Sequence, residues 1–182
     1  MPSLVGSEMC IRDRNKLSKL TECYFIQSDL STIDGNKKLI EEANTKLGKI
    51  DTLINNAGTF QDTDFENINE ENFDKTFNLN VRGYMFTSRE FVKQISNDQN
   101  NSSIICIGSS NSLAAEKNSV MYDTSKGAVL MMIKSMAISL ASKNIRVNGI
   151  GPGILETPLT SEGLNKGNNK KVITSQIPLG RI

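Results

Sequence analysis

The chain has 182 residues, 21 basic and 20 acidic side chains, a formal net charge of +1 and no histidine. Scattered charges in this balance leave no electrostatic footprint for nucleic acid or for an anionic membrane, and they fit a small neutral substrate better. The absence of histidine excludes Ser-His-Asp and Cys-His hydrolases and disfavours a zinc site. The length fits one domain.

Cysteine usage and hydropathy indicate the compartment. Cys10, Cys23 and Cys106 show no metal-ligand spacing, and Cys106 lies in an apolar run, where a free buried thiol is usual. The longest apolar stretch, residues 128–141, is interrupted by lysine and serine and is too short to span a bilayer. We therefore expect a protein of the reducing cytoplasm with no membrane segment.

The first residues of the chain do not fit a fold pattern. Met1–Arg14 has no clear hydrophobic period and resembles a translated sequencing-adapter segment. We interpret residues 1–14 as an artefactual or disordered extension and keep them out of the fold. The alternative is a short flexible or targeting extension, although an apolar core segment and an Arg-rich amphipathic pattern are both missing.

The first half of the remaining chain alternates strand and helix patterns. The apolar run 23–27 predicts a strand, and the polar turn Ser28-Asp29-Leu30 ends it. Residues 35–49 predict a helix, because apolar side chains form one stripe and charges lie opposite. Residues 50–54 predict the next strand, which is closed by Asn55-Asn56-Ala57-Gly58.

A long helix pattern covers residues 71–95, with apolar positions spaced by three or four. Asn80 interrupts this apolar neighbourhood, and a buried asparagine must find hydrogen-bond partners. Its amide either satisfies a nearby carbonyl in a purely structural way or has a role in a site.

The second half continues the alternation. Residues 104–107 predict a strand, and Ser109 follows it. The segment from Tyr122 to residue 140 predicts a helix that is apolar nearly all round, so it must be buried on more than one side. A second subunit on its outer face, at a position such as Met132, explains this, and a thicker loop layer within one chain is the alternative.

Tyr122 and Lys126 suggest the chemistry. Four residues apart on a helix, their side chains share one face. An isolated phenol has a pKa near 10, and a cation one turn away favours the phenolate, which brings the pKa toward the working range. A loop that returns Ser109 to Tyr122 would let two hydroxyls hold a carbonyl oxygen. Taken alone, Tyr and Lys at this spacing are more often an ordinary surface pair.

The chain ends with a strand and polar segments. Residues 144–149 predict the strand, and the segment from Ile150 to Gly153 predicts a turn. Residues 160–177 are polar and contain two glycines and a lysine cluster, which predicts a mobile loop over the site. Alternating strands and helices predict an α/β fold whose parallel sheet carries helices on both faces, with ligands at the carboxyl ends of the strands.

Taken in order, the motifs resemble the short-chain dehydrogenase/reductase family over residues 23–182. They are Asn55-Asn-Ala-Gly58, Asn80, Ser109, Tyr122-x-x-x-Lys126, and Pro152-Gly153 with Thr157. The resemblance implies an NAD- or NADP-dependent oxidoreductase acting on a small carbonyl or alcohol, as a homodimer or homotetramer. It implies that Tyr122 is the acid or base, that Lys126 lowers its pKa and holds the ribose, that Ser109 orients the oxygen, and that Asn80 supports a water relay. It implies that the cofactor contacts Asp29, Leu30, Asn56, Ala57, Gly58, Tyr122, Lys126, Pro152, Gly153, Leu155 and Thr157, with Asp29 and Leu30 near the adenine.

The sequence also departs from the family pattern at three motifs. The glycine-rich phosphate loop T-G-x-x-x-G-x-G, the second strand that selects NAD or NADP, and the final strand are not found in the sequence. We therefore interpret residues 15–182 as a partial Rossmann-type domain, with the coenzyme preference undecided. A 3-oxoacyl-thioester reductase, a sugar or steroid dehydrogenase and a xenobiotic carbonyl reductase all fit. The alternatives are a non-catalytic binding or regulatory subunit and an inactive truncated fragment.

Overall fold

The computed structural model describes residues 19–95 and 101–182, so the predicted extension 1–14 lies outside the described residues. In chain order the described elements are α2 (Ile33–Leu47), β1 (Thr52–Asn55), η2 (Phe65–Asn67), α3 (Glu70–Phe77), η3 (Asn78–Gly83), α4 (Tyr84–Gln94), β2 (Ser103–Ile107), η4 (Ser110–Ser112), α5 (Val120–Leu140), η5 (Ala141–Lys143), β3 (Arg146–Ile150), α6 (Ser161–Asn165) and α7 (Asn169–Gln176). None of the helices within these residues is both long enough and apolar enough to cross a membrane.

Among the described residues, three strands form one parallel sheet in the order β1-β2-β3. Leu53 lies opposite Ile104, and Ile104 lies opposite Val147, so these three side chains share one face. Ile104 is fully buried on that face. The predicted α/β class with a parallel sheet is confirmed.

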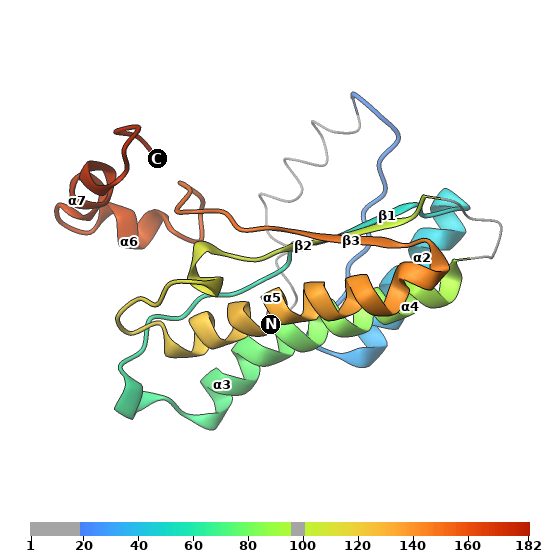
Figure 1. Cartoon of the computed structure of the whole chain (residues 1–182), viewed down its shortest axis with the longest axis horizontal. Helices are drawn as coiled ribbons and strands as arrows, with labels where there is room; N and C mark the ends of the chain where they lie inside the picture. Colours follow the sequence, from blue (N-terminus) through green and yellow to red (C-terminus); the bar gives the residue numbers. More distant parts are fainter. Residues whose placement is uncertain (1–18, 96–100) are drawn as a thin grey trace.

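The helices that cover the sheet explain its buried face. In Figure 1, α4 and α5 run side by side beneath the sheet, and α2 packs against α4. The other face carries Ile54 and Ile150, both of which are more than half exposed. The described residues thus supply a helix layer on one face, and the second layer of the predicted arrangement is not found among them.

The core lies between the sheet and this helix layer. Its buried members are Ile40, Tyr84, Phe91, Ile104, Cys106, Val129, Met132, Ile145 and Val147. Helix α2 begins after Thr32, whose side chain accepts a hydrogen bond from Gly35 N and so satisfies one free amide of the first turn. It ends at Gly48, whose positive φ suits the end of a helix.

Helix α5 is apolar on two sides, as its sequence predicts, but the two sides differ in exposure. Val129 and Met132 belong to the core, and Met132 is only 5% exposed. Met131 and Ile138 face outward, at 59% and 81% exposure. The expectation that Met132 is an outer position is therefore wrong, because the turn of the helix places Met131 on the outer side instead.

Three predicted elements differ in the structure. Residues 23–27 are not a strand, because this segment has no ladder partner among the described residues and a strand is defined by that pairing. The predicted helix 71–95 is interrupted by the π-helical segment η3. The predicted loop 160–177 contains the short helices α6 and α7, the first of which buries Leu164. The glycines at positions 163 and 167 interrupt the helical pattern, so the sequence indicates a loop there.

Candidate active site

Tyr122 and Lys126 lie on the first turns of α5. The Lys126 ammonium is 5.7 Å from the centre of the Tyr122 ring and 5.5 Å from that of Tyr84. Lys126 is only 4% exposed, and its Nζ donates to the carbonyl oxygen of Ile107 at 2.8 Å. The carboxyl end of β2 therefore anchors the lysine.

Burial controls the charge of Lys126. Removal from water lowers the pKa of its ammonium to about 8, because the charged form loses hydration. The Ile107 carbonyl and the two ring faces replace part of that hydration. At neutral pH the lysine is still mostly protonated, but the burial of its ammonium lowers the stability of the fold.

The environment of Tyr122 corrects one expectation. Burial of the half-buried Tyr122 raises its pKa, a hydrogen bond with Ser109 opposes this, and the carboxylates of Asp123 and Glu116 raise the pKa further. Lys126 directs its ammonium to the Ile107 carbonyl and the ring faces. The predicted lowering of the phenol pKa by Lys126 is therefore not seen.

Ser109 follows β2 and caps η4. Its Oγ accepts a hydrogen bond from Asn111 N at 3.1 Å, and its side chain lies close enough to Tyr122 to lower the pKa of the phenol. The return of this loop over the start of α5 is thus present. The neighbouring Ser112 has a different partner, because its Oγ donates to the Lys126 backbone carbonyl at 3.0 Å.

Asn80 lies in η3 and is fully buried. Its Oδ1 accepts from Thr59 N at 2.8 Å, and its Nδ2 donates to Thr59 O and to Ser125 Oγ, both at 3.0 Å. Ser125 Oγ in turn donates to the Tyr122 carbonyl at 2.7 Å. The amide therefore ties the segment after β1 to the turn that carries Tyr122. The relay water stays a prediction.

The Asn-Asn-Ala-Gly motif follows β1 at the same edge of the sheet. Asn55 Nδ2 donates to Ser88 Oγ at 2.9 Å, which fixes the strand end to α4. A Cβ placed on Gly58 would lie 3.3 Å from Asn80 Oδ1 and 3.8 Å from Lys126 Nζ. Gly58 thus brings bare backbone next to two of the predicted catalytic residues.

Three of the predicted cofactor residues line one cavity. Leu30, Asn56 and Ala57 border a space of about 100 Å³ together with residues of α2 and α4. Asp29 lies outside it, beside a larger hollow of about 410 Å³. Its carboxylate accepts hydrogen bonds from the backbone and hydroxyl of Ser31.

The segment after β3 runs beside the Ser109 loop. The Pro152 carbonyl accepts from Ser110 N at 2.9 Å, so the turn is joined to the loop that carries Ser109. Gly153 and Leu155 are exposed. The Thr157 hydroxyl shares a hydrogen bond of 3.1 Å with Thr160 at the start of α6. Nothing ties Leu155 or Thr157 to Tyr122 among the described contacts.

Sequence reasoning missed two residues of this site. Phe60 packs edge-on against Tyr122, with ring centres 5.1 Å apart, and no pattern in the loop 60–69 predicts it. Ser125 links Asn80 to the Tyr122 turn, and its place directly before Lys126 was an available signal. Within the described part of the chain, no three His, Cys, Asp or Glu side chains gather as metal ligands do.

The cluster can perform proton transfer at a bound oxygen. Ser109 and Tyr122 present two hydroxyls, Lys126 supplies a buried ammonium, and Gly58 leaves backbone accessible beside them. These groups come from the ends of β1 and β2 and from α5, at the carboxyl edge of the sheet where ligands of such folds bind.

Comparison with known proteins agrees with this geometry. The family model described as short chain dehydrogenase matches residues 8–167. The 3-oxoacyl-[acyl-carrier-protein] reductase FabG of Thermotoga maritima is 36% identical over 148 residues, which cover 81% of this chain and 59% of the reductase. The chain therefore spans about three fifths of the length of that relative.

Solved structures show the same fold. A gluconate 5-dehydrogenase from Burkholderia cenocepacia in complex with NADP and tartrate matches with a TM-score of 0.79 and 25% identity, over 84% of this chain and 60% of that one. A 3-ketoacyl-(acyl-carrier-protein) reductase from Brucella melitensis complexed with NADH matches with a TM-score of 0.78 and 30% identity, over 86% of this chain and 64% of that one.

Proposed function

Since this chain belongs to the short-chain dehydrogenase family, we propose that the whole protein is an oxidoreductase that transfers a hydride between NAD or NADP and a carbonyl or secondary alcohol. The observation that carries the proposal is the cluster at the start of α5. Ser109 lies close enough to Tyr122 to lower the pKa of the phenol, and the buried Lys126 ammonium lies over the Tyr122 ring. Two hydroxyls beside a buried cation are suited to proton transfer at a carbonyl oxygen.

Each residue of the cluster has a distinct role in this proposal. The Tyr122 phenol donates a proton to the carbonyl oxygen in reduction and takes it back in oxidation. Burial raises the pKa of Tyr122, so the phenol keeps its proton at neutral pH, which is the form that reduction needs. Ser109 orients the oxygen, and Asn80 with Ser125 holds the turn of α5 that carries the phenol.

The residues at the strand ends fit a nicotinamide dinucleotide. When bound, the nicotinamide supplies or accepts the hydride. A Cβ on Gly58 would lie 3.3 Å from Asn80 Oδ1, tighter than an ordinary contact, so the glycine keeps the backbone beside the predicted catalytic residues free of a side chain. The cavity between Leu30 and Ala57 supports binding of the adenine end. Lys126 is the residue that would hold the nicotinamide ribose, and the Pro152 turn runs along the same edge.

The substrate and assembly are finer parts of the proposal. The 36% identity to the Thermotoga maritima reductase makes a 3-oxoacyl thioester the first substrate to test, and the likeness to a gluconate 5-dehydrogenase makes sugar acids the second. The exposed apolar side chains of Met131 and Ile138 on α5 support association into a homodimer or homotetramer.

The test is a steady-state assay of the whole protein with NADH or NADPH and a panel of carbonyl compounds. Tyr122→Phe should lower kcat by about a hundredfold to ten-thousandfold, because it removes the proton donor. Tyr24→Phe, at an exposed position, is the matched control and should retain the wild-type rate. A Tyr122→Phe rate equal to that of the control refutes the role of the phenol. Cofactor bound without turnover of any carbonyl would favour the non-catalytic binding subunit instead.

A further inference from the structure

The backbone of Leu30 is held from two sides. Asn36 Nδ2 in α2 donates to the Leu30 carbonyl oxygen at 3.2 Å. On the other side, a Cβ placed on Gly83 would lie 2.8 Å from the same oxygen, so a side chain there would collide with the Leu30 backbone. Leu30 borders the cavity of about 100 Å³ that also contains Ala57. Its carbonyl is therefore fixed directly behind a cavity wall.

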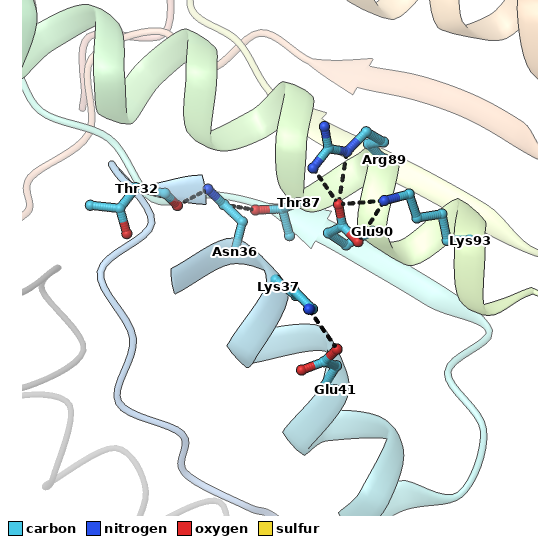
Figure 2. A network of polar contacts seen from close by, with 8 residues as sticks. All are labelled: Thr32, Asn36, Lys37, Glu41, Thr87, Arg89, Glu90 and Lys93. Carbon is cyan, nitrogen blue, oxygen red and sulfur yellow. Dashed lines mark hydrogen bonds and ion pairs between the residues drawn. The ribbon is translucent and has the colours of Figure 1, made fainter. Parts of the chain in front are cut away.

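Asn36 is fully buried, and its amide is hydrogen-bonded on both sides. Nδ2 donates to the Thr32 carbonyl as well as to that of Leu30, and Oδ1 accepts from the Thr87 hydroxyl in α4. Figure 2 shows Asn36 between Thr32 and Thr87. The side chain thus braces the loop 29–32 against α4. An apolar residue of similar size would fill the space but would leave the carbonyl without this donor.

We propose that Asn36 and Gly83 are positioning residues that fix the Leu30 backbone and thereby set the shape of the cavity between Leu30 and Ala57. The inference rests on the proposed function, since it assigns the adenine end of the cofactor to this cavity. Asn36 does not border the cavity and acts through Leu30, whereas Gly83 and Thr87 border the cavity as well. Loss of either brace weakens adenine binding and leaves the nicotinamide end unchanged, because Tyr122 and Lys126 lie on α5.

Variants at Thr87 distinguish an effect on the position of the Leu30 backbone from an effect on the stability of the fold. Thr87→Val removes the hydrogen bond to Asn36 Oδ1 but leaves the Nδ2 donor to Leu30 in place. Asn36→Leu removes both, and it leaves the Thr87 hydroxyl buried without this partner. The double variant Asn36→Leu/Thr87→Val removes that buried hydroxyl too, so the part of the stability lost through the unpaired hydroxyl should return. Lys37→Ala, in an exposed ion pair with Glu41 on the same helix, controls for substitution in α2.

The experiment measures adenosine monophosphate and nicotinamide mononucleotide binding to the 182-residue chain by methyl NMR, together with urea unfolding. In the wild type, adenosine monophosphate should shift the Leu30 and Ala57 methyl signals. Asn36→Leu and the double variant should both weaken its binding by about fivefold or more, the loss expected from one neutral hydrogen bond. Thr87→Val and Lys37→Ala should stay within about twofold of the wild type. Nicotinamide mononucleotide binding should be unaffected throughout.

Gly83→Ala is an independent test, because it displaces the Leu30 carbonyl without changing any hydrogen-bonding group. It should move the Leu30 methyl signals and weaken adenosine monophosphate binding as Asn36→Leu does. The proposal is overturned if Asn36→Leu and Thr87→Val weaken the nucleotide equally, if stability and affinity return together in the double variant, or if the nucleotide leaves Leu30 and Ala57 unperturbed. If the variants change nucleotide binding as expected but the whole protein transfers no hydride, only the proposed function is refuted.

Discussion

Replacement of Lys126 by methionine is expected to change stability in opposite directions at neutral and alkaline pH. Burial lowers the pKa of the ammonium from its ordinary 10.5 to about 8. At about 1.4 kcal/mol for each pH unit, protonated Lys126 costs the fold about 3 kcal/mol at neutral pH. The lost hydrogen bond to Ile107 offsets about 2 kcal/mol of this, while the Tyr84 hydroxyl still donates to that carbonyl. Lys126→Met should therefore be about 1 kcal/mol more stable than the wild type at pH 7.

The sign reverses at high pH. The pKa of Lys126 is lower in the folded than in the unfolded state, so the unfolded state binds more protons between about pH 8 and 10.5, and wild-type stability rises through that window. Near pH 10 most of the charge penalty is gone, so the variant should lose its advantage, and at still higher pH it should be about 1 kcal/mol less stable because only the hydrogen bond is lost. Urea unfolding of both proteins from pH 7 to pH 10 measures this, with Lys134→Met on the exposed side of α5 as control. A stability difference that does not change with pH would refute the reasoning.

Three further changes have definite expected outcomes. Ile138→Glu should shift the whole protein toward monomers in sedimentation velocity, because it places a charge on the exposed apolar side of α5, whereas Ser139→Glu should not; a wild type that is monomeric at micromolar concentration contradicts this. Asn80→Ala should lower the free energy of unfolding by about 2 to 4 kcal/mol, since it removes three hydrogen bonds of a buried amide, and a loss no larger than that of Asn78→Ala would contradict it. Because the pKa of Tyr122 lies above its ordinary value, carbonyl reduction should keep a constant rate from about pH 6 until Lys126 begins to lose its charge near pH 8. A reduction rate that already falls near neutral pH in a pH–rate profile would show that another group loses the proton.

The parallel sheet and the placement of Tyr122 and Lys126 on one helix could be predicted from the sequence. The first two strands of the sheet contain short apolar runs followed by asparagine or glycine, and the four-residue spacing fixes two side chains on one helix face. Local patterns of this kind depend only on neighbouring residues. They do not depend on which distant segments meet.

The electrostatics of the site could not be predicted in the same way. The Tyr-Lys spacing predicts a phenol pKa lowered by the lysine, but the pKa of Tyr122 is set mainly by its burial, to which Phe60 from a separate loop contributes. Lys126 is drawn to the Ile107 carbonyl on a different strand. Both effects depend on tertiary contacts that lie far away in the sequence.

The wide turn at Asn78–Gly83 also has a consequence for how this segment tolerates changes in length. A π-helical turn holds one residue more than the regular helix around it. Deleting one residue here, such as Val81, would restore the regular repeat and leave the orientation of α4 against α3 unchanged, because the wide turn already absorbs the extra residue. The side chains of Tyr84, Ser88 and Phe91 would then keep their places in α4. We therefore expect a one-residue deletion to be accepted more readily at this turn than within the regular turns of α3 or α4, where it would rotate everything that follows by about 100°.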